Sequence, residues 1–173
     1  TQPVVLHVTA EHPALLDADT DVLAAHKALV AETDALFGHR PFAHYDFLLA
    51  VSDVFSGIGL EHAQSSENGM HEGYLQGEPP IADNDLLAHE YVHAWIGKAW
   101  RPTGSFSPHY NAPADNRGLW IYEGLTQYWA LVLSARSGLW SQQQALARLA
   151  PLQAQFAGQP GRRGRDLADT PYQ

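Results

Sequence analysis

The chain has 173 residues, of which 45% are hydrophobic and 17% are charged, a composition that suits one compact domain. Its 19 acidic and 10 basic residues give a formal net charge of −9, which argues against nucleic acid and anionic membranes as partners because phosphate binding needs clustered Lys and Arg. Cysteine is absent, so thiolate ligands are excluded and any metal site must use His, Asp or Glu.

The first half of the chain predicts one helix and two extended segments. Apolar residues recur at helical spacing over 17–37, with charged residues on the other face. Residues 45–51 are aromatic and branched and predict a buried strand, and residues 55–60 predict a second extended segment. The sequence from 61 to 80 predicts a loop.

The second half predicts three helices. Polar side chains at residues 83–85 can cap the free N–H groups of the first, which ends near Gly97. Helical spacing returns over 119–135, after a loop rich in proline. The last helix is predicted over 141–156, and Pro151 should kink or interrupt it because proline has no backbone N–H.

This order, with strands early and helices late, favours an α+β fold that is mainly helical, with a small early β portion, over alternating α/β. We predict a single domain over residues 1–173. The sequence starts at Thr1 without an initiator Met and stops soon after a Gly- and Arg-rich stretch, so we expect it to be part of a longer protein.

The strongest chemical signal is the pentad His89-Glu90-Tyr91-Val92-His93 within the second predicted helix. Four residues are just over one turn, so both imidazoles leave the same face about 6 Å apart along the axis and can bind one ion. Glu90 lies about 100° around the helix, where its carboxylate could reach a water on the metal. The pattern arises by chance in about 3% of chains of this composition, which leaves two structural histidines as the alternative.

Glu123 is the best candidate for a third ligand, which a catalytic zinc commonly needs beside an open position. It lies in the otherwise apolar and aromatic segment 120–126, where an unpaired carboxylate would be costly to bury. The alternatives are an exposed helix charge or a partner for an arginine.

Three motifs in this order resemble the glycyl aminopeptidase family of zinc metallopeptidases. They are Gly59-Leu60-Glu61-His62, His89-Glu90-Tyr91-Val92-His93-Ala94-Trp95 and Trp120-Ile121-Tyr122-Glu123-Gly124-Leu125-Thr126-Gln127-Tyr128. The similarity runs from about Phe55 to Trp140. The family belongs to the gluzincins, so the resemblance implies a thermolysin-like metallopeptidase catalytic domain with an HExxH active-site helix.

The resemblance implies His89, His93 and Glu123 as zinc ligands and Glu90 as general base, in agreement with the spacing. It also implies an aminopeptidase that hydrolyses small N-terminal residues, Gly or Ala, from peptide substrates.

The resemblance further implies that Gly59, Leu60 and Glu61 line the substrate cleft. Their backbone would pair with the peptide, and the Glu61 carboxylate could hold its free α-amine. Without the resemblance, a glutamate in such a segment is usually only solvated.

Full proteins of the family often carry an N-terminal β domain and a C-terminal PDZ domain, so neighbouring domains are expected partners. The family's oxyanion-stabilising tyrosine is expected downstream of Gln173, which would leave this chain catalytically incomplete on its own. Tyr110, Tyr122 and Tyr128 remain alternatives as oxyanion donors, and packing is the other interpretation of each. We expect a soluble protein of the bacterial cytoplasm or periplasm.

One departure concerns the group that orients a ligand histidine. Many gluzincins have an acidic residue four positions after the ligand glutamate, and here that position is Gln127. Asp85, Asp115 and Thr126 are possible substitutes.

Two other functions remain open from the sequence. A peptide-binding module could retain zinc for structure without catalysis, although the intact Glu90 and the set of only three ligands argue against it. A related hydrolase could act on a substrate that is not a peptide.

Overall fold

A computed structural model describes residues 3–77, 85–109 and 111–170. Its centre is a four-stranded mixed sheet in the order β1-β2-β4-β3. Three of the strands are parallel, and β3, at one edge, runs antiparallel to β4. The strands are β1 Val4–Ala10, β2 Tyr45–Val51, β3 Ile58–Glu61 and β4 Ser65–Met70.

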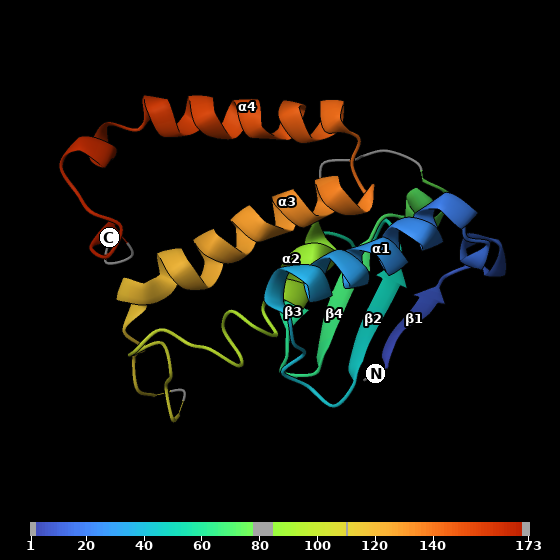
Figure 1. Cartoon of the computed structure of the whole chain (residues 1–173), viewed down its shortest axis with the longest axis horizontal. Coiled ribbons are helices and arrows are strands. Elements are labelled where there is room, and N and C mark those ends of the chain that lie inside the picture. The colour runs from blue at the N-terminus through green and yellow to red at the C-terminus, as the bar shows by residue number, and fades with distance from the viewer. Residues whose placement is uncertain (1–2, 78–84, 110, 171–173) are drawn as a thin grey trace.

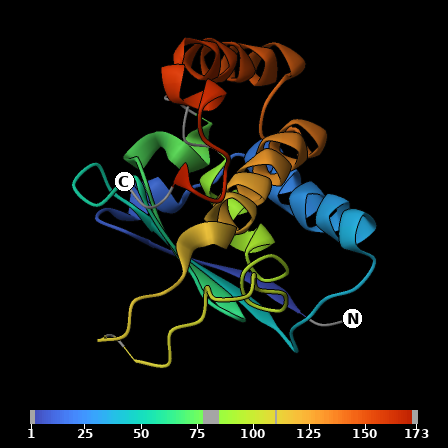
Figure 2. The same cartoon turned by 90° about the vertical axis from the view of Figure 1, so that its left-hand side faces the viewer.

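The longer helices lie mainly on one side of this sheet (Figures 1 and 2). They are α1 Thr20–Phe37, α2 Leu86–Val92, α3 Thr126–Ser137 and α4 Gln142–Gly158. Figure 1 shows α4 farthest from the sheet, beyond α3. The α+β class is confirmed, whereas the extent of the domain stays a prediction. None of the described helices combines the length and the apolar character that a membrane span requires.

The sheet has more strands than the sequence predicted. β1 lies in a segment for which no element was predicted, and the loop predicted over 61–80 is wrong because it contains β4 and the short 3₁₀ helix Glu72–Gln76. β4 lacks an apolar alternation, yet its backbone is bonded on both sides. Its polar side chains bond within the strand, where Asn68 Nδ2 donates to Ser66 Oγ at 3.0 Å.

The helices match their predicted positions with local differences. α1 begins after Asp19, which accepts a hydrogen bond from the backbone N–H of Asp21, and ends at Gly38 in the left-handed conformation. α4 runs through Pro151, so of the predicted kink or interruption the interruption does not occur, and the kink stays a prediction. The helix predicted from residue 119 is not uniform, because the π-helix Trp120–Leu125 precedes α3.

The core holds α2 in place against the sheet. Tyr45 and Phe47 of β2 are buried on the helical side, where the Tyr45 ring centroid lies 4.7 Å from that of Tyr91. Trp95 continues this aromatic cluster at 5.1 Å from Tyr91. Because these large rings pack on one side of α2, the polar residues of the helix project from its other side.

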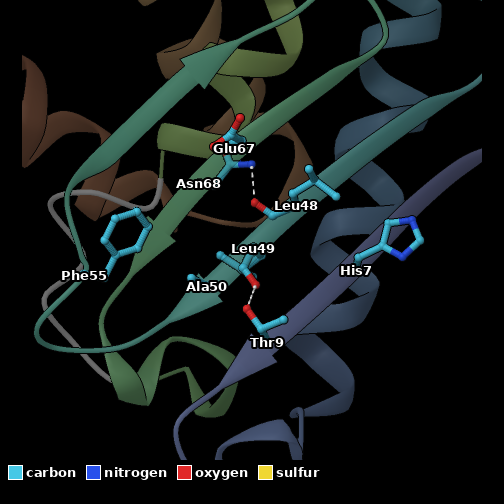
Figure 3. A pocket seen from close by; sticks show the side chains of 8 residues that line it. All are labelled: His7, Thr9, Leu48, Leu49, Ala50, Phe55, Glu67 and Asn68. Carbon is cyan, nitrogen blue, oxygen red and sulfur yellow. Dashed lines mark hydrogen bonds between the residues drawn. The ribbon is translucent and has the colours of Figure 1, made fainter.

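The opposite side of the sheet is more open. Leu48 is 44% exposed there, although its neighbours in β2 are buried. Figure 3 shows a pocket of about 210 Å³ on this side, with His7, Thr9 and Phe55 among its lining residues. This pocket contains none of the residues of the predicted metal site.

Candidate active site

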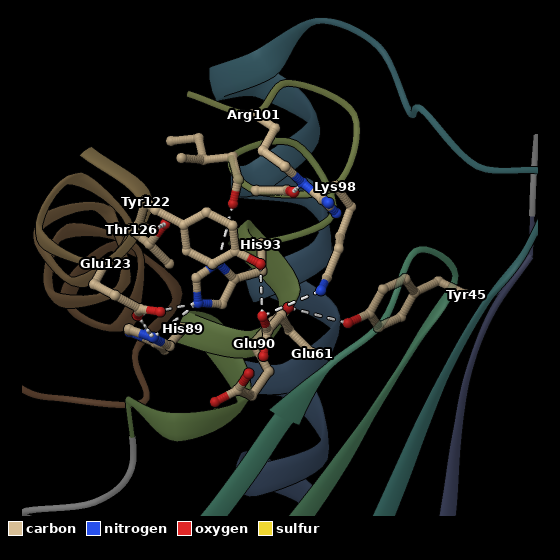
Figure 4. Close-up of polar contacts among 12 residues, drawn as sticks. Tyr45, Glu61, His89, Glu90, His93, Lys98, Arg101, Tyr122, Glu123 and Thr126 are labelled. Carbon is tan, nitrogen blue, oxygen red and sulfur yellow. Dashed lines mark hydrogen bonds and ion pairs between the residues drawn. The ribbon is translucent and has the colours of Figure 1, made fainter. Parts of the chain in front are cut away.

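His89, His93 and Glu123 come together from two separate elements (Figure 4). α2 contributes His89, His93 follows as its C-terminal cap, and the π-helix contributes Glu123. The two histidine Nε2 atoms are 3.1 Å apart. Glu123 Oε2 lies 3.3 Å from His89 Nε2 and 3.4 Å from His93 Nε2. These three residues could hold a metal ion.

The ring of His93 is oriented by the protein backbone. Its Nδ1 donates to the carbonyl of Ile96 at 3.0 Å, so Nε2 is the ring nitrogen directed at His89 and Glu123. His93 is also 1% exposed, so this orientation is maintained by packing. His89 Nδ1 is buried without a hydrogen-bond partner, although the Gln127 amide is close enough to contribute to raising the pKa of His89.

The spacing of the three donor atoms fits a tetrahedral zinc site. Bonds of about 2.0–2.1 Å at tetrahedral angles separate ligand atoms by about 3.3–3.4 Å. The three edges observed, 3.1, 3.3 and 3.4 Å, are close to that value. Two imidazole nitrogens and one carboxylate oxygen also match the ligand types of catalytic zinc.

The charges of the three residues are coupled. Hydrogen bonds from His89 and His93 lower the pKa of Glu123 to about 2. Burial lowers the pKa of His89, but Glu123, Glu90 and Gln127 together outweigh burial and raise the pKa overall. The expectation that Glu123 is buried is wrong, since its side chain is 47% exposed. Its proximity to both histidines, rather than burial, makes it a candidate ligand.

Glu90 occupies the position expected of a base beside this trio. It is 5% exposed, and burial raises the pKa of its carboxyl although both histidines act in the opposite direction. The hydroxyl of Tyr45 donates to its backbone carbonyl at 3.2 Å. A carboxyl with a raised pKa is suited to exchange a proton near neutral pH.

β3 approaches Glu90 so closely that any residue larger than glycine at one position would displace the Glu90 side chain. A Cβ on Gly59 would overlap the Glu90 carboxylate and would lie 2.7 Å from Leu86 Cδ1. Gly59 pairs with β4 on one side only, and no strand of the described residues pairs with the other edge of β3. Leu60, by contrast, is 47% exposed, and strand alternation turns its side chain away from that of Glu61.

The carboxylate of Glu61 lies near Glu90 and His93, with ligand atoms of the three within 4.8 Å of one another. Its Oε1 accepts from Tyr122 Oη at 2.6 Å and lies 3.1 Å from Lys98 Nζ (Figure 4). Burial raises the pKa of Glu61, but these partners outweigh it and lower the pKa. The resemblance pointed to Glu61, whereas Lys98 was not predicted and has no sequence signal of its own.

A pocket of about 240 Å³ opens beside His89 and Glu90. Its other lining residues are Gly57, Asp85, Leu86, Gln127 and Arg148. Of these, Arg148 comes from α4 and was not predicted, because nothing in the sequence relates that helix to the site.

Gln127 contacts Asp85, one of the predicted substitutes, and contributes to raising the pKa of His89. Its Nε2 donates to Asp85 Oδ2 at 2.6 Å. Asp85 therefore does not cap α2, contrary to prediction, because its carboxylate is engaged elsewhere and it makes no side-chain cap bond. Residues 83 and 84 of the predicted cap lie outside the described residues.

The remaining alternatives have other partners. Asp115 binds Arg117, and Thr126 Oγ1 donates to the Tyr122 carbonyl. Tyr128 is 54% exposed. Tyr110 lies outside the described residues.

Comparison with known proteins identifies the family of the chain. The model of the M61 glycyl aminopeptidase family matches residues 83–173, more than half of the chain. A similar solved structure is that of an aminopeptidase N family protein from Idiomarina loihiensis, with 28% sequence identity and a TM-score of 0.70. The match covers 83% of this chain and 25% of that one. The comparison with curated proteins gave no match. The chain belongs to the M61 glycyl aminopeptidase family, a family of metallopeptidases.

Proposed function

We propose that this chain is the catalytic core of a zinc-dependent aminopeptidase that removes small N-terminal residues, Gly or Ala, from peptides. His89, His93 and Glu123 are the proposed zinc ligands, and Glu90 is the proposed general base. The observation that carries the proposal is the triangle of donor atoms with edges of 3.1–3.4 Å, with a buried carboxyl beside it. Membership of the family supports the reaction class.

Zinc held by these residues supplies a Lewis acid that polarises the scissile carbonyl and lowers the pKa of water. Glu90 accepts the proton of the attacking water and later delivers it to the leaving amine. Its burial favours this exchange, because a desolvated carboxyl holds a proton more readily than an exposed one.

The free edge of β3 is the proposed binding surface for the substrate backbone. An extended peptide can add to a sheet edge through main-chain hydrogen bonds, and β3 lies directly against Glu90. An antiparallel peptide would place its N-terminus at the Glu61 end of the strand. There the Glu61 carboxylate would bind the α-ammonium group in place of Lys98, which contacts the same oxygen.

We further propose that other parts of the full-length protein complete the site. In support, the chain spans only 25% of the Idiomarina loihiensis protein that it resembles. The oxyanion donor is assigned to such a part, because Tyr122 is engaged with Glu61 and Tyr128 is largely exposed.

The test uses the full-length protein loaded with zinc and a panel of peptides with Gly, Ala or Leu at the N-terminus. Glu90→Gln should abolish turnover while one zinc per chain stays bound, because the ligands are untouched. Glu67→Gln on the open side of the sheet is the matched control and should leave turnover unchanged. Turnover retained in Glu90→Gln refutes the proposed role. Zinc and peptide binding without hydrolysis by the unmodified protein would favour the binding module instead.

A further inference from the structure

Arg148 projects from α4 into the pocket beside His89 and Glu90. Its Nε is buried and has no hydrogen-bond partner in the described part of the chain. Buried polar groups are normally hydrogen-bonded, and a guanidinium stays charged at any physiological pH. Arg148 also lines the pocket, and a guanidinium that borders a cavity without a partner of its own is a position for an anionic ligand.

The acidic residues of the pocket do not satisfy Arg148. Neither Asp85 nor Glu90 forms an ion pair with it within 4.0 Å, among the residues that the structure describes. Asp85 instead accepts a hydrogen bond from Gln127. The charge of Arg148 therefore remains available to a molecule that enters the pocket.

The direction of β3 relates this pocket to the substrate, on the basis of the proposed function. A peptide antiparallel to β3 starts at Glu61 and continues past Gly59 toward Gly57. Gly57 lines the same pocket as Arg148. Residues that follow the scissile bond would thus run toward the guanidinium, on the side opposite to the α-amine.

We propose that Arg148 binds a carboxylate in the part of the substrate that follows the scissile bond. The substrate class is then short peptides with a free C-terminal carboxylate, or peptides with an acidic side chain in that part. The planar fork of the guanidinium suits two-pronged recognition of a carboxylate. Glu61 and Arg148 would together select for peptides that carry a positive charge at one end and a negative charge near the other.

Binding measurements test this assignment without relying on turnover. Three ligands are titrated by calorimetry into the zinc-loaded full-length protein with Glu90→Gln: Gly-Ala-Ala as the free acid, the same peptide as its C-terminal amide, and Gly-Glu-Ala amide. The free acid, or the Glu-containing amide, should bind more tightly than the neutral amide. Arg148→Met should reduce that preference by about 10- to 100-fold, because a hydrogen bond to a charged group is lost.

Matched variants separate this role from a structural one. Arg163→Met removes an exposed charge of the C-terminal region and should keep the preference. Arg148→Lys keeps the charge without the fork and should give an intermediate preference, which serves as a second variant if Arg148→Met does not fold. The proposal is overturned if Arg148→Met keeps the preference, if it weakens acid and amide equally, or if the protein with Arg148 has no preference. If the full-length protein with Glu90 did not hydrolyse peptides, only the aminopeptidase assignment would be refuted. The ratio of the affinities for the free acid and the amide could still be measured and would still test the role of Arg148.

Discussion

Gly59→Ala is expected to separate catalysis from metal binding. The added Cβ would overlap the Glu90 carboxylate and meet Leu86 Cδ1 at 2.7 Å, whereas unstrained carbon contacts are about 3.5–4.0 Å. Both neighbouring side chains must therefore move by about 1 Å. Overpacking of this size costs about 1–3 kcal/mol of stability, and a misplacement of about 1 Å in a reacting group costs on the order of 100-fold in rate.

The assay measures kcat on Gly- and Ala-peptides, zinc content and the melting temperature of the full-length variant. We expect kcat to fall on the order of 100-fold with one zinc still bound, because the three proposed ligands are not touched. Gly158→Ala is the control, since no atom lies within 4 Å of its added Cβ. An unchanged kcat in Gly59→Ala would refute the close approach of β3 to the base.

Three further perturbations test the surroundings of the site. Lys98→Met should strengthen the binding of glycinamide, measured by calorimetry, because it removes the cation that competes with the substrate amine for Glu61. The affinity for N-acetylglycinamide, which has no free amine, should not change. An unchanged affinity for glycinamide would contradict this prediction. Gln127→Ala should weaken zinc affinity by about 10-fold, measured by competition with a chelator, because the side chain that bonds Asp85 and raises the pKa of His89 is lost. Full zinc affinity in this variant would exclude a supporting role for Gln127. Zinc affinity should also fall as the pH drops through the raised pKa of His89, since a proton then competes with the metal for Nε2. The metal-free protein should show the opposite trend in stability, because the contact of protonated His89 with Glu123 is lost as the pH rises through the same pKa. A zinc affinity that does not change with pH would be inconsistent with His89 as a ligand.

Most of the candidate site could be predicted because its geometry is largely local. His89, Glu90 and His93 lie within about one turn of helix, so their relative positions follow from helix geometry. Glu123 needed its aromatic surroundings and the family motif, and the reason given from burial was wrong because its side chain is 47% exposed. What brings Glu123 to the histidines is the packing of two helices, which no local pattern specifies.

The parts that were not predicted depend on contacts between distant segments. β4 carries Ser, Glu and Asn where a buried strand normally has apolar residues, and it is a strand because β2 and β3 pair with it on both sides. Lys98 and Arg148 reach the site only after folding, one from the turn that follows α2 and the other from α4. Neither the spacing of apolar residues along the sequence nor its motifs indicates which distant segments come into contact.

X-ray absorption at the zinc edge, combined with an anomalous-scattering crystal structure of the full-length protein, tests the central claim most directly. We predict one zinc per chain, bound by the Nε2 atoms of His89 and His93 and a carboxylate oxygen of Glu123 at about 2.0–2.2 Å. The same region offers a competing trio, since Glu61, Glu90 and His93 also have ligand atoms within 4.8 Å of one another. Zinc on that trio, or a folded protein that binds no divalent ion, would contradict the account.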